Sequence, residues 1–174
     1  MSKAVMLSIR PKWVEKIASG EKTIEVRKTR PKLDTPFKCY IYCTLPKYPH
    51  EDFIATDYPR PQFYGGGKVI GEFVSDCVTP LYNVCMDDWK RLTGGLHNIE
   101  KELVNQACLT EVKLHTYAGG KNCFAWHISD LLIYDQPKGL DEFTRLRETK
   151  FGSEPVTIKR QPQSWCYVED VQVE

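Results

Sequence analysis

Residues Gly20–Lys28 read GEKTIEVRK and directly follow a segment typical of a short helix. That helix is predicted over Pro11–Ser19, because Pro11 suits the first helical position and Val14 and Ile17 share one apolar face. The glycine that opens the quoted stretch is a residue type that commonly ends helices. The sequence therefore predicts a helix, a tight turn and a change of structure at this point.

The quoted stretch then alternates with the period of a β-strand, predicted over Lys22–Arg27. One face of this strand is apolar and carries Ile24 and Val26. The other face carries the chemistry, with Thr23, Glu25 and Arg27. An arginine offers a planar fork suited to phosphate or carboxylate, and a lysine that loses its hydration becomes a nucleophile. Lys22, Glu25 and Arg27 are therefore the first candidate site residues.

Further strands are predicted where β-branched and aromatic residues gather, at Tyr40–Leu45, Val69–Val78, Phe124–Tyr134 and Ser164–Val168. Gly71, inside the second of these, predicts a β-bulge. Short helices are predicted over Met86–Leu92 and Ile99–Cys108, and a helical turn within Asp141–Thr149. Phe151–Pro162 shows no clear period. Short strands with few helices favour an α+β fold built on a small mixed β-barrel with flanking short helices.

Composition places the 174 residues among globular proteins, with 41% hydrophobic residues, 11% aromatic residues and a formal net charge of +1. We expect one domain over residues 1–174, with a long Pro-rich loop at about 46–67 and a C-terminal extension at about 137–174. No apolar run approaches the roughly 18 residues of a membrane span, and the first ten residues do not resemble a secretory signal. A cytoplasmic location without membrane contact is expected.

The charge is unevenly distributed along the chain. Residues 10–32 hold eight basic and three acidic side chains, a local charge of +5 that leaves −4 for the rest of the chain. Because attraction to phosphate depends on local charge, this segment favours an anionic partner, and nucleic acid is the first candidate. Unpaired bases stack on aromatic rings, and Tyr64 in the Gly-flanked loop is the aromatic residue least committed to packing.

The seven cysteines form no CxxC pair, and an odd number of cysteines without a secretory signal indicates reduced thiols. Cys39 and Cys43 lie on one strand face, where they are expected to act as small buried hydrophobic residues. The four histidines show no HExxH or HxxxH spacing. Neither a metal site nor another cofactor is therefore expected.

Taken together, the runs LSIRPKW, SGEKTIEVRK, VIGEFVSD, AWHISDL and QSWCYVED resemble the bacterial ASCH domains of the PUA-like superfamily. The most specific element is GxKxxExR, which here is Gly20, Lys22, Glu25 and Arg27. The resemblance spans nearly the whole chain and implies a β-barrel of five or six strands. It also implies a cleft beside the motif that in related domains receives RNA or a modified base.

The function expected from charge and resemblance together is binding of RNA or a modified nucleotide in a basic cleft next to GxKxxExR. Its nucleotide-binding residues are predicted to be Ser8, Arg10, Lys22, Glu25, Arg27 and Tyr64. Reversing the charge of Arg27 is expected to abolish this binding without unfolding the domain.

Two enzymatic alternatives remain open, with Lys22 and Glu25 as candidate catalytic residues. Some small ASCH proteins deacetylate N4-acetylcytidine with a lysine, a threonine and a glutamate. Lys22 matches that lysine, but Glu25 stands where the threonine is expected. The second alternative is a metal-free ribonuclease, which needs acid and base groups beside a phosphate clamp. A third reading is a protein-interaction domain, so the sequence leaves catalysis undecided.

Overall fold

The computed structural model describes residues 3–45, 65–81 and 98–170. Its helices are α1 (Pro11–Ala18), α3 (Asn98–Gln106), α4 (Glu111–Ala118) and the short 3₁₀ helix η3 (Leu140–Glu142). Its strands are β1 (Lys3–Ile9), β2 (Ile24–Arg27), β3 (Phe37–Cys43), β4 (Lys68–Ser75), β5 (Val78–Leu81), β6 (Cys123–His127), β7 (Ser129–Lys138), β8 (Thr144–Thr149), β9 (Gly152–Thr157) and β10 (Trp165–Glu169). The fold is mixed α+β, as predicted. The predicted helix Met86–Leu92 and almost all of the predicted loop lie outside the described residues.

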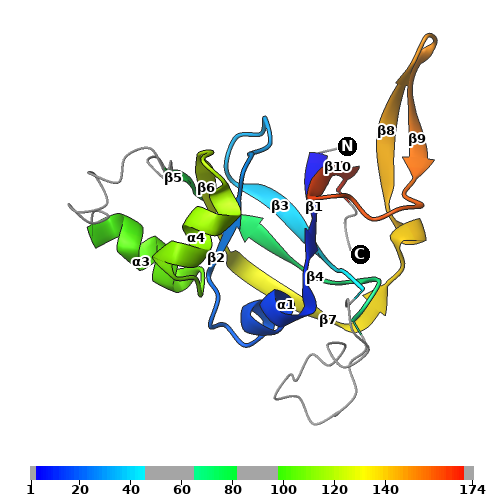
Figure 1. Cartoon of the computed structure of the whole chain (residues 1–174). Coiled ribbons are helices and arrows are strands. Elements are labelled where there is room, and N and C mark those ends of the chain that lie inside the picture. Colours follow the sequence, from blue (N-terminus) through cyan, green and yellow to red (C-terminus); the bar gives the residue numbers. More distant parts are fainter. Residues whose placement is uncertain (1–2, 46–64, 82–97, 171–174) are drawn as a thin grey trace.

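The strands form three sheets (Figure 1). The largest has the order β10-β1-β3-β4-β7, in which β1 and β3 run parallel and all other neighbours antiparallel. A second sheet has the order β2-β6-β5, and β8 and β9 form a two-stranded hairpin. The described strands thus fall into separate sheets, and closure into a barrel stays a prediction. No helix in the described part of the chain is long and apolar enough to cross a membrane.

The helix and strand predicted around the GxKxxExR motif are confirmed. In α1, Val14 and Ile17 are buried, and the backbone after the helix turns at Gly20, whose φ of +79° is a left-handed conformation that glycine adopts without strain. In β2, however, all four residues are buried. The polar face of this strand therefore points into the molecule.

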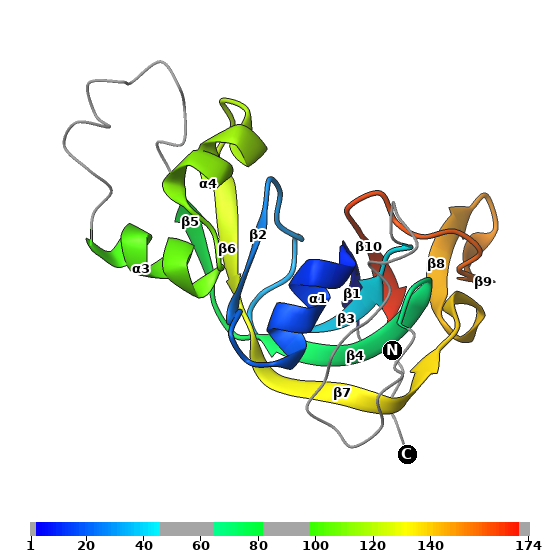
Figure 2. The same ribbon diagram turned by 60° about the horizontal axis from the view of Figure 1, so that its bottom comes forward.

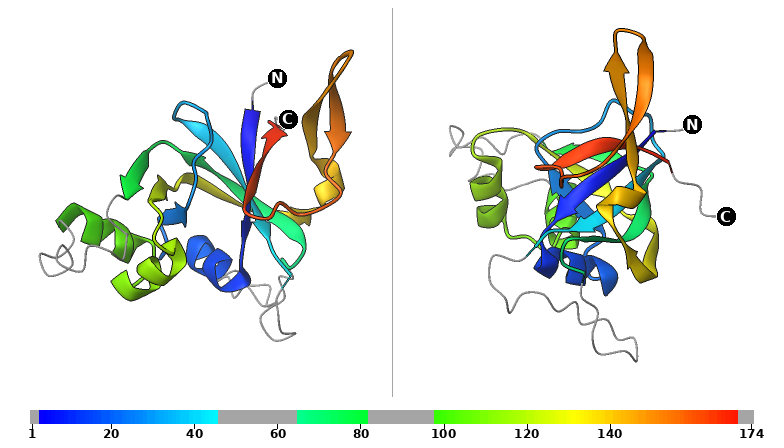
Figure 3. Two further views of the ribbon diagram at one scale, coloured as in Figure 1. Left: turned by 45° about the horizontal axis from the view of Figure 1, so that its top comes forward. Right: turned by 90° about the vertical axis from the view of Figure 1, so that its right-hand side faces the viewer.

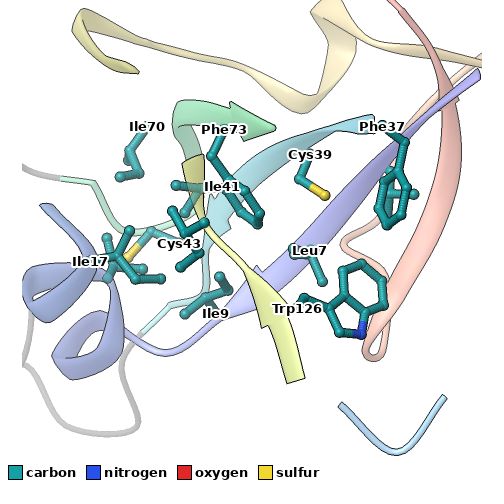
Figure 4. Close-up of a cluster of buried hydrophobic side chains, with 13 residues drawn as sticks. Leu7, Ile9, Ile17, Phe37, Cys39, Ile41, Cys43, Ile70, Phe73 and Trp126 are labelled. Carbon is teal, nitrogen blue, oxygen red and sulfur yellow. The ribbon is translucent and has the colours of Figure 1, made fainter. Parts of the chain in front are cut away.

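Both faces of β2 are buried because the sheet β2-β6-β5 has packing partners on each side. On one side, Ile24 and Val26 pack with Val104 of α3 and Leu114 of α4. Figure 2 shows these two helices beside this sheet, on the side away from β1. On the other side, Trp126 of β6 enters a cluster formed mainly by β1, α1, β3 and β4 (Figure 4). The motif is thus held between two layers of apolar packing.

Two smaller predictions are also confirmed. Cys39 and Cys43 are both buried in the hydrophobic cluster formed mainly by β1, α1, β3 and β4. The pairing of β3 with β4 shifts register just before Gly71, as in a β-bulge. A Cβ atom at Gly71 would lie 2.4 Å from the carbonyl oxygen of Leu132 in β7, so the bulge allows a close backbone approach.

Two predictions about elements need correction, and several elements were not predicted. Phe124–Tyr134 is not one strand: the chain breaks at Ile128, after which β7 leaves the sheet of β6 and pairs with β4. The helical turn predicted within Asp141–Thr149 is present only at its start, as part of η3 (Leu140–Glu142). The remainder is mainly strand β8, which pairs along its length with β9. That partner strand lies in Phe151–Pro162, where the sequence shows no period. Strand β1 and helix α4 were not predicted at all.

Candidate functional site

The structure brings Lys22, Glu25 and Arg27 together in one buried cluster of charges. Their exposed fractions are 3%, 7% and 7%. Glu25 lies between the two cations: its Oε2 is 3.2 Å from Lys22 Nζ, and its Oε1 is 3.0 Å from Arg27 Nη2. Removing charges from water costs several kcal/mol per ion unless they are paired and hydrogen-bonded, so the three residues depend on one another.

Lys22 is fixed by acceptors on every side. Besides Glu25, its ammonium donates to the carbonyl oxygens of Ile24 at 2.7 Å and of Ala107, just after α3, at 2.9 Å. It also lies 5.3 Å from the centre of the Trp13 ring. Because an ammonium has three protons and three oxygen acceptors surround it here, Lys22 acts as an anchor between β2 and α3. A nucleophilic role requires it to lose its proton and give up these contacts.

Arg27 joins the sheet of β2 to the large sheet. Its Nη2 donates to the carbonyl oxygen of Ser8 in β1 at 2.9 Å, and its Nη1 lies 3.3 Å from both the carbonyl and the hydroxyl oxygen of Ser164. The Ser8 hydroxyl is itself committed to the carbonyl oxygen of Pro162 at 2.6 Å. Of the predicted site residues, Ser8, Lys22, Glu25 and Arg27 are therefore in one contact network.

This network leaves positive charge and two buried donors uncompensated. Two cations share one carboxylate, which gives a net charge of +1. Among the described residues, Arg27 Nε and Trp126 Nε1 are buried without a hydrogen-bond partner. Trp126 of β6 pairs directly with Glu25 of β2. The side chains of Trp126 and Arg27 therefore lie on the same face of this sheet as Glu25. Buried donors of this kind are uncommon, and they suit an acceptor oxygen.

Exposed basic residues follow directly after the cluster. Lys28, Arg30 and Lys32 are exposed and make no ion pair within the described part of the chain. We call residues 28–32 the basic segment. It is fixed to β10, because Trp165 Nε1 donates to the Thr29 hydroxyl at 3.0 Å and Lys32 N donates to the Tyr167 hydroxyl at 2.8 Å.

The remaining predicted site residues are not part of the cluster. Arg10 is exposed and caps α1 with its backbone, its carbonyl oxygen accepting from the amides of Trp13 and Val14. Tyr64 lies outside the described residues.

The burial of Arg27 also changes the expected outcome of its charge reversal. Arg27→Glu would place two carboxylates side by side in the interior, so this variant is expected to unfold.

The structure gives one histidine a partner that the sequence did not reveal. His127 Nδ1, at the end of β6, lies 2.6 Å from Asp76 Oδ1, in the connection between β4 and β5. The hydrogen bond from His127 lowers the pKa of the Asp76 carboxyl. A carboxylate on Nδ1 orients the imidazole and leaves Nε2 for proton transfer. Since the two residues are 51 positions apart, only the fold brings them together.

The other groups offer less chemistry. Burial raises the pKa of the Cys39 thiol well above its usual range, so this cysteine stays protonated. Within residues 3–45, 65–81 and 98–170, no group of three or more His, Cys, Asp or Glu side chains is arranged to hold a metal ion.

Two features thus define the class of protein: a mixed α+β fold, and a buried charged motif that is followed along the chain by exposed basic residues. The family model of the ASCH domain matches residues 7–116, which is more than half of the chain. The chain therefore belongs to the ASCH domain family, which is consistent with the PUA-like superfamily.

Solved structures agree with this membership. The crystal structure of ASCH from Zymomonas mobilis is similar at 19% identity and a TM-score of 0.52, with 95% of this chain and 87% of that chain covered. A tyrosine-to-phenylalanine mutant of the Zymomonas mobilis protein gives 20% identity, a TM-score of 0.52, and coverage of 97% and 91%. At this identity the likeness shows the fold alone. No curated protein matches the chain in sequence.

Proposed function

We propose that this protein binds RNA or a modified nucleotide at the basic segment, which directly follows the buried cluster of Lys22, Glu25 and Arg27 along the chain. The observation that carries the proposal is the uncompensated positive charge at this place. The cluster has a net charge of +1, and the adjoining Lys28, Arg30 and Lys32 have no acidic partner among the described residues. Phosphate groups supply the missing negative charge.

The aromatic residues beside the basic segment support a nucleotide as the ligand. Trp165 and Tyr167 are half-buried, and their rings meet edge to face with centroids 5.3 Å apart. Base stacking on an exposed ring face contributes about 1–3 kcal/mol and tolerates any base. Membership of the ASCH family, whose domains are associated with nucleic acids, points the same way.

We also propose that residues 1–174 form one PUA-like domain, which the pairing of β10 with β1 supports.

Binding is tested by fluorescence anisotropy with a labelled 12-nucleotide single-stranded RNA. The double variant Arg30→Glu, Lys32→Glu changes only exposed side chains of the basic segment. Its affinity is expected to fall by about tenfold or more, since phosphate contacts dominate such binding. Lys101→Glu with Lys113→Glu is the matched control, because it changes the net charge equally on α3 and α4. Equal losses in both double variants would show a general charge effect and contradict the site.

A hydrolase is the second candidate function, favoured by the Asp76–His127 pair. An imidazole oriented by a carboxylate is a suitable general acid or base for cleaving RNA or a modified nucleoside. Lys22, by contrast, already donates to three oxygens. The test incubates N4-acetylcytidine and single-stranded RNA with the protein and analyses the products by mass spectrometry. Loss of turnover in a folded His127→Asn variant would support a hydrolase, and unchanged substrates with wild-type protein would exclude both activities.

A further inference from the structure

The hairpin of β8 and β9 projects from the rest of the molecule (Figure 3). Its tip carries an exposed aromatic residue, Phe151. Thr149 pairs with Gly152, so Lys150 and Phe151 form the turn between the strands. The exposed fraction of Phe151 is 101%, the largest among the large hydrophobic residues that the structure describes. The family model ends at residue 116, so this hairpin lies beyond it.

Phe151 is exposed because hydrogen bonds fix the turn in which it lies. The Thr149 hydroxyl donates to the carbonyl oxygen of Gly152 at 2.7 Å and accepts from the amide of Phe151 at 3.2 Å. Gly152 has a φ of +121°, which a side chain would disfavour. The turn therefore holds its phenylalanine away from the rest of the chain.

The base of the hairpin is anchored in the interior. Phe143 and Ile158, which flank the two strands, are buried against the outer face of the large sheet. They are joined to each other by a backbone hydrogen bond of 2.9 Å, from Ile158 N to the carbonyl oxygen of Phe143. The Phe143 ring also packs edge to face on Tyr40, with centroids 4.9 Å apart. The hairpin is thus an arm with a fixed base and an apolar tip.

The charge of this arm suits a polyanion. Residues 144–160 contain five basic and two acidic side chains, a net charge of +3. Residues 10–32 carry +5, which leaves −7 for the rest of a chain whose total is +1. Positive charge is therefore concentrated in these two segments. A protein partner with an apolar pocket would not require this distribution.

The basic segment and the hairpin flank the same strand, β10. Hydrogen bonds from Trp165 to Thr29 and from Lys32 to Tyr167 fix the basic segment to β10. On the hairpin side, β8 contacts β10. Burial raises the pKa of the Cys166 thiol in β10, and the charge of the nearby Arg145 in β8 opposes this rise. Figure 1 shows the connection between β2 and β3 and the hairpin rising on the same side of the molecule, with β10 between them.

We propose that the hairpin is a second contact for single-stranded RNA, in which Phe151 stacks on an unpaired base while Lys150 lies near the backbone phosphates. The inference rests on the proposed function, because the strand would extend from the basic segment across β10 to the arm. A short oligonucleotide would reach the basic segment only. A longer one would reach both contacts.

The test compares labelled RNAs of 4 and 12 nucleotides by anisotropy, with wild-type protein and with variants of Phe151. Phe151→Ala is expected to weaken binding of the longer RNA by about tenfold and to leave the shorter one unchanged, because stacking is lost at one base. Phe151→Leu should behave like Phe151→Ala, and Phe151→Trp should retain wild-type affinity. Val112→Ala, which shortens an exposed side chain on α4, is the control.

The outcomes separate this inference from the proposed function. If wild-type protein binds both RNAs and Phe151→Ala binds them equally well, the hairpin contact is wrong and the basic segment stands. If wild-type protein binds neither RNA, the proposed function fails and the inference fails with it. If Phe151→Ala instead dissociates an oligomer in light scattering and leaves RNA affinity unchanged, the tip is a self-association surface and the inference is overturned.

Discussion

Glu25 is the residue on which the charged cluster depends. It is the acidic partner of both Lys22 and Arg27, and all three side chains are nine-tenths or more buried. The alternation of residues 22–27 predicted correctly that Glu25 and Arg27 share a face. It did not predict that the face is covered, because two of the covering residues, Trp126 of β6 and Ser164 just before β10, are far away in the sequence.

Glu25→Gln should destabilise the protein strongly, because it leaves two buried cations without a counter-charge. Breaking a buried ion pair on one side typically costs about 3–5 kcal/mol. The free energy of unfolding from a urea titration measures the effect. Glu21→Gln is the control, since it removes an acid from the exposed pair of Lys16 and Glu21 and is expected to change little. A Glu25→Gln variant as stable as the control would show that the cluster is solvated.

Tyr134 belongs to a second polar cluster, on the large sheet. Its hydroxyl donates to Glu72, whose other oxygen lies 3.3 Å from Lys38 Nζ. Burial and the Glu72 carboxylate raise the pKa of the Tyr134 phenol well above its usual range. The unfolded chain releases this proton near pH 10, whereas the folded protein keeps it. The contribution of Tyr134 to stability is therefore fully present below about pH 10 and is lost as the pH rises above that value.

Tyr134→Phe should make the alkaline loss of stability less steep, because the residue no longer releases a proton on unfolding. The measurement is the midpoint of thermal unfolding of both proteins between pH 8 and pH 11. Near pH 8 the variant is expected to be the less stable protein, since Glu72 loses a hydrogen bond. Parallel curves for the two proteins over the whole range would contradict the assignment.

At the scale of the elements, local pattern predicted α1, β2, β3, β4, α3 and β10 within a few residues. It failed where pairing partners decide the structure. The run Phe124–Tyr134 reads as one strand, yet β6 and β7 belong to different sheets. Residues 144–149 are a strand because β9 pairs with them. Strand β1 shows no alternation, because residues 4–7 are all buried between layers of packing.

The bulge at Gly71 provides a test of how closely β4 and β7 approach. In Gly71→Ala, the added methyl group would meet the Leu132 carbonyl oxygen at 2.4 Å and the Ile133 Cα at 3.1 Å. Since both are backbone atoms, β7 must shift, and overpacking of this kind costs about 1–3 kcal/mol. Urea unfolding measures the loss, with Lys68→Ala at the exposed start of β4 as control. A loss no larger than in the control would mean that the strands lie further apart.

At the scale of the whole molecule, two segments far apart in the sequence carry the positive charge of an almost neutral chain. The sequence indicated the first, residues 10–32, and the family resemblance indicated its association with nucleic acid. It did not indicate that Lys22, Glu25 and Arg27 would be buried, which leaves Lys28, Arg30 and Lys32 as the exposed charges. The asymmetry, rather than the net charge of +1, underlies the proposed binding.

Binding of phosphates by the basic segment is best tested by the salt dependence of affinity for a 12-nucleotide single-stranded RNA. If phosphates lie on the exposed basic residues, the logarithm of the association constant should fall linearly with the logarithm of the salt concentration. The slope of this line should be about −0.7 for each phosphate neutralised. Arg30→Glu with Lys32→Glu should reduce that slope, and Lys101→Glu with Lys113→Glu should leave it unchanged. Binding that is absent, or independent of salt, would contradict phosphate binding at the basic segment.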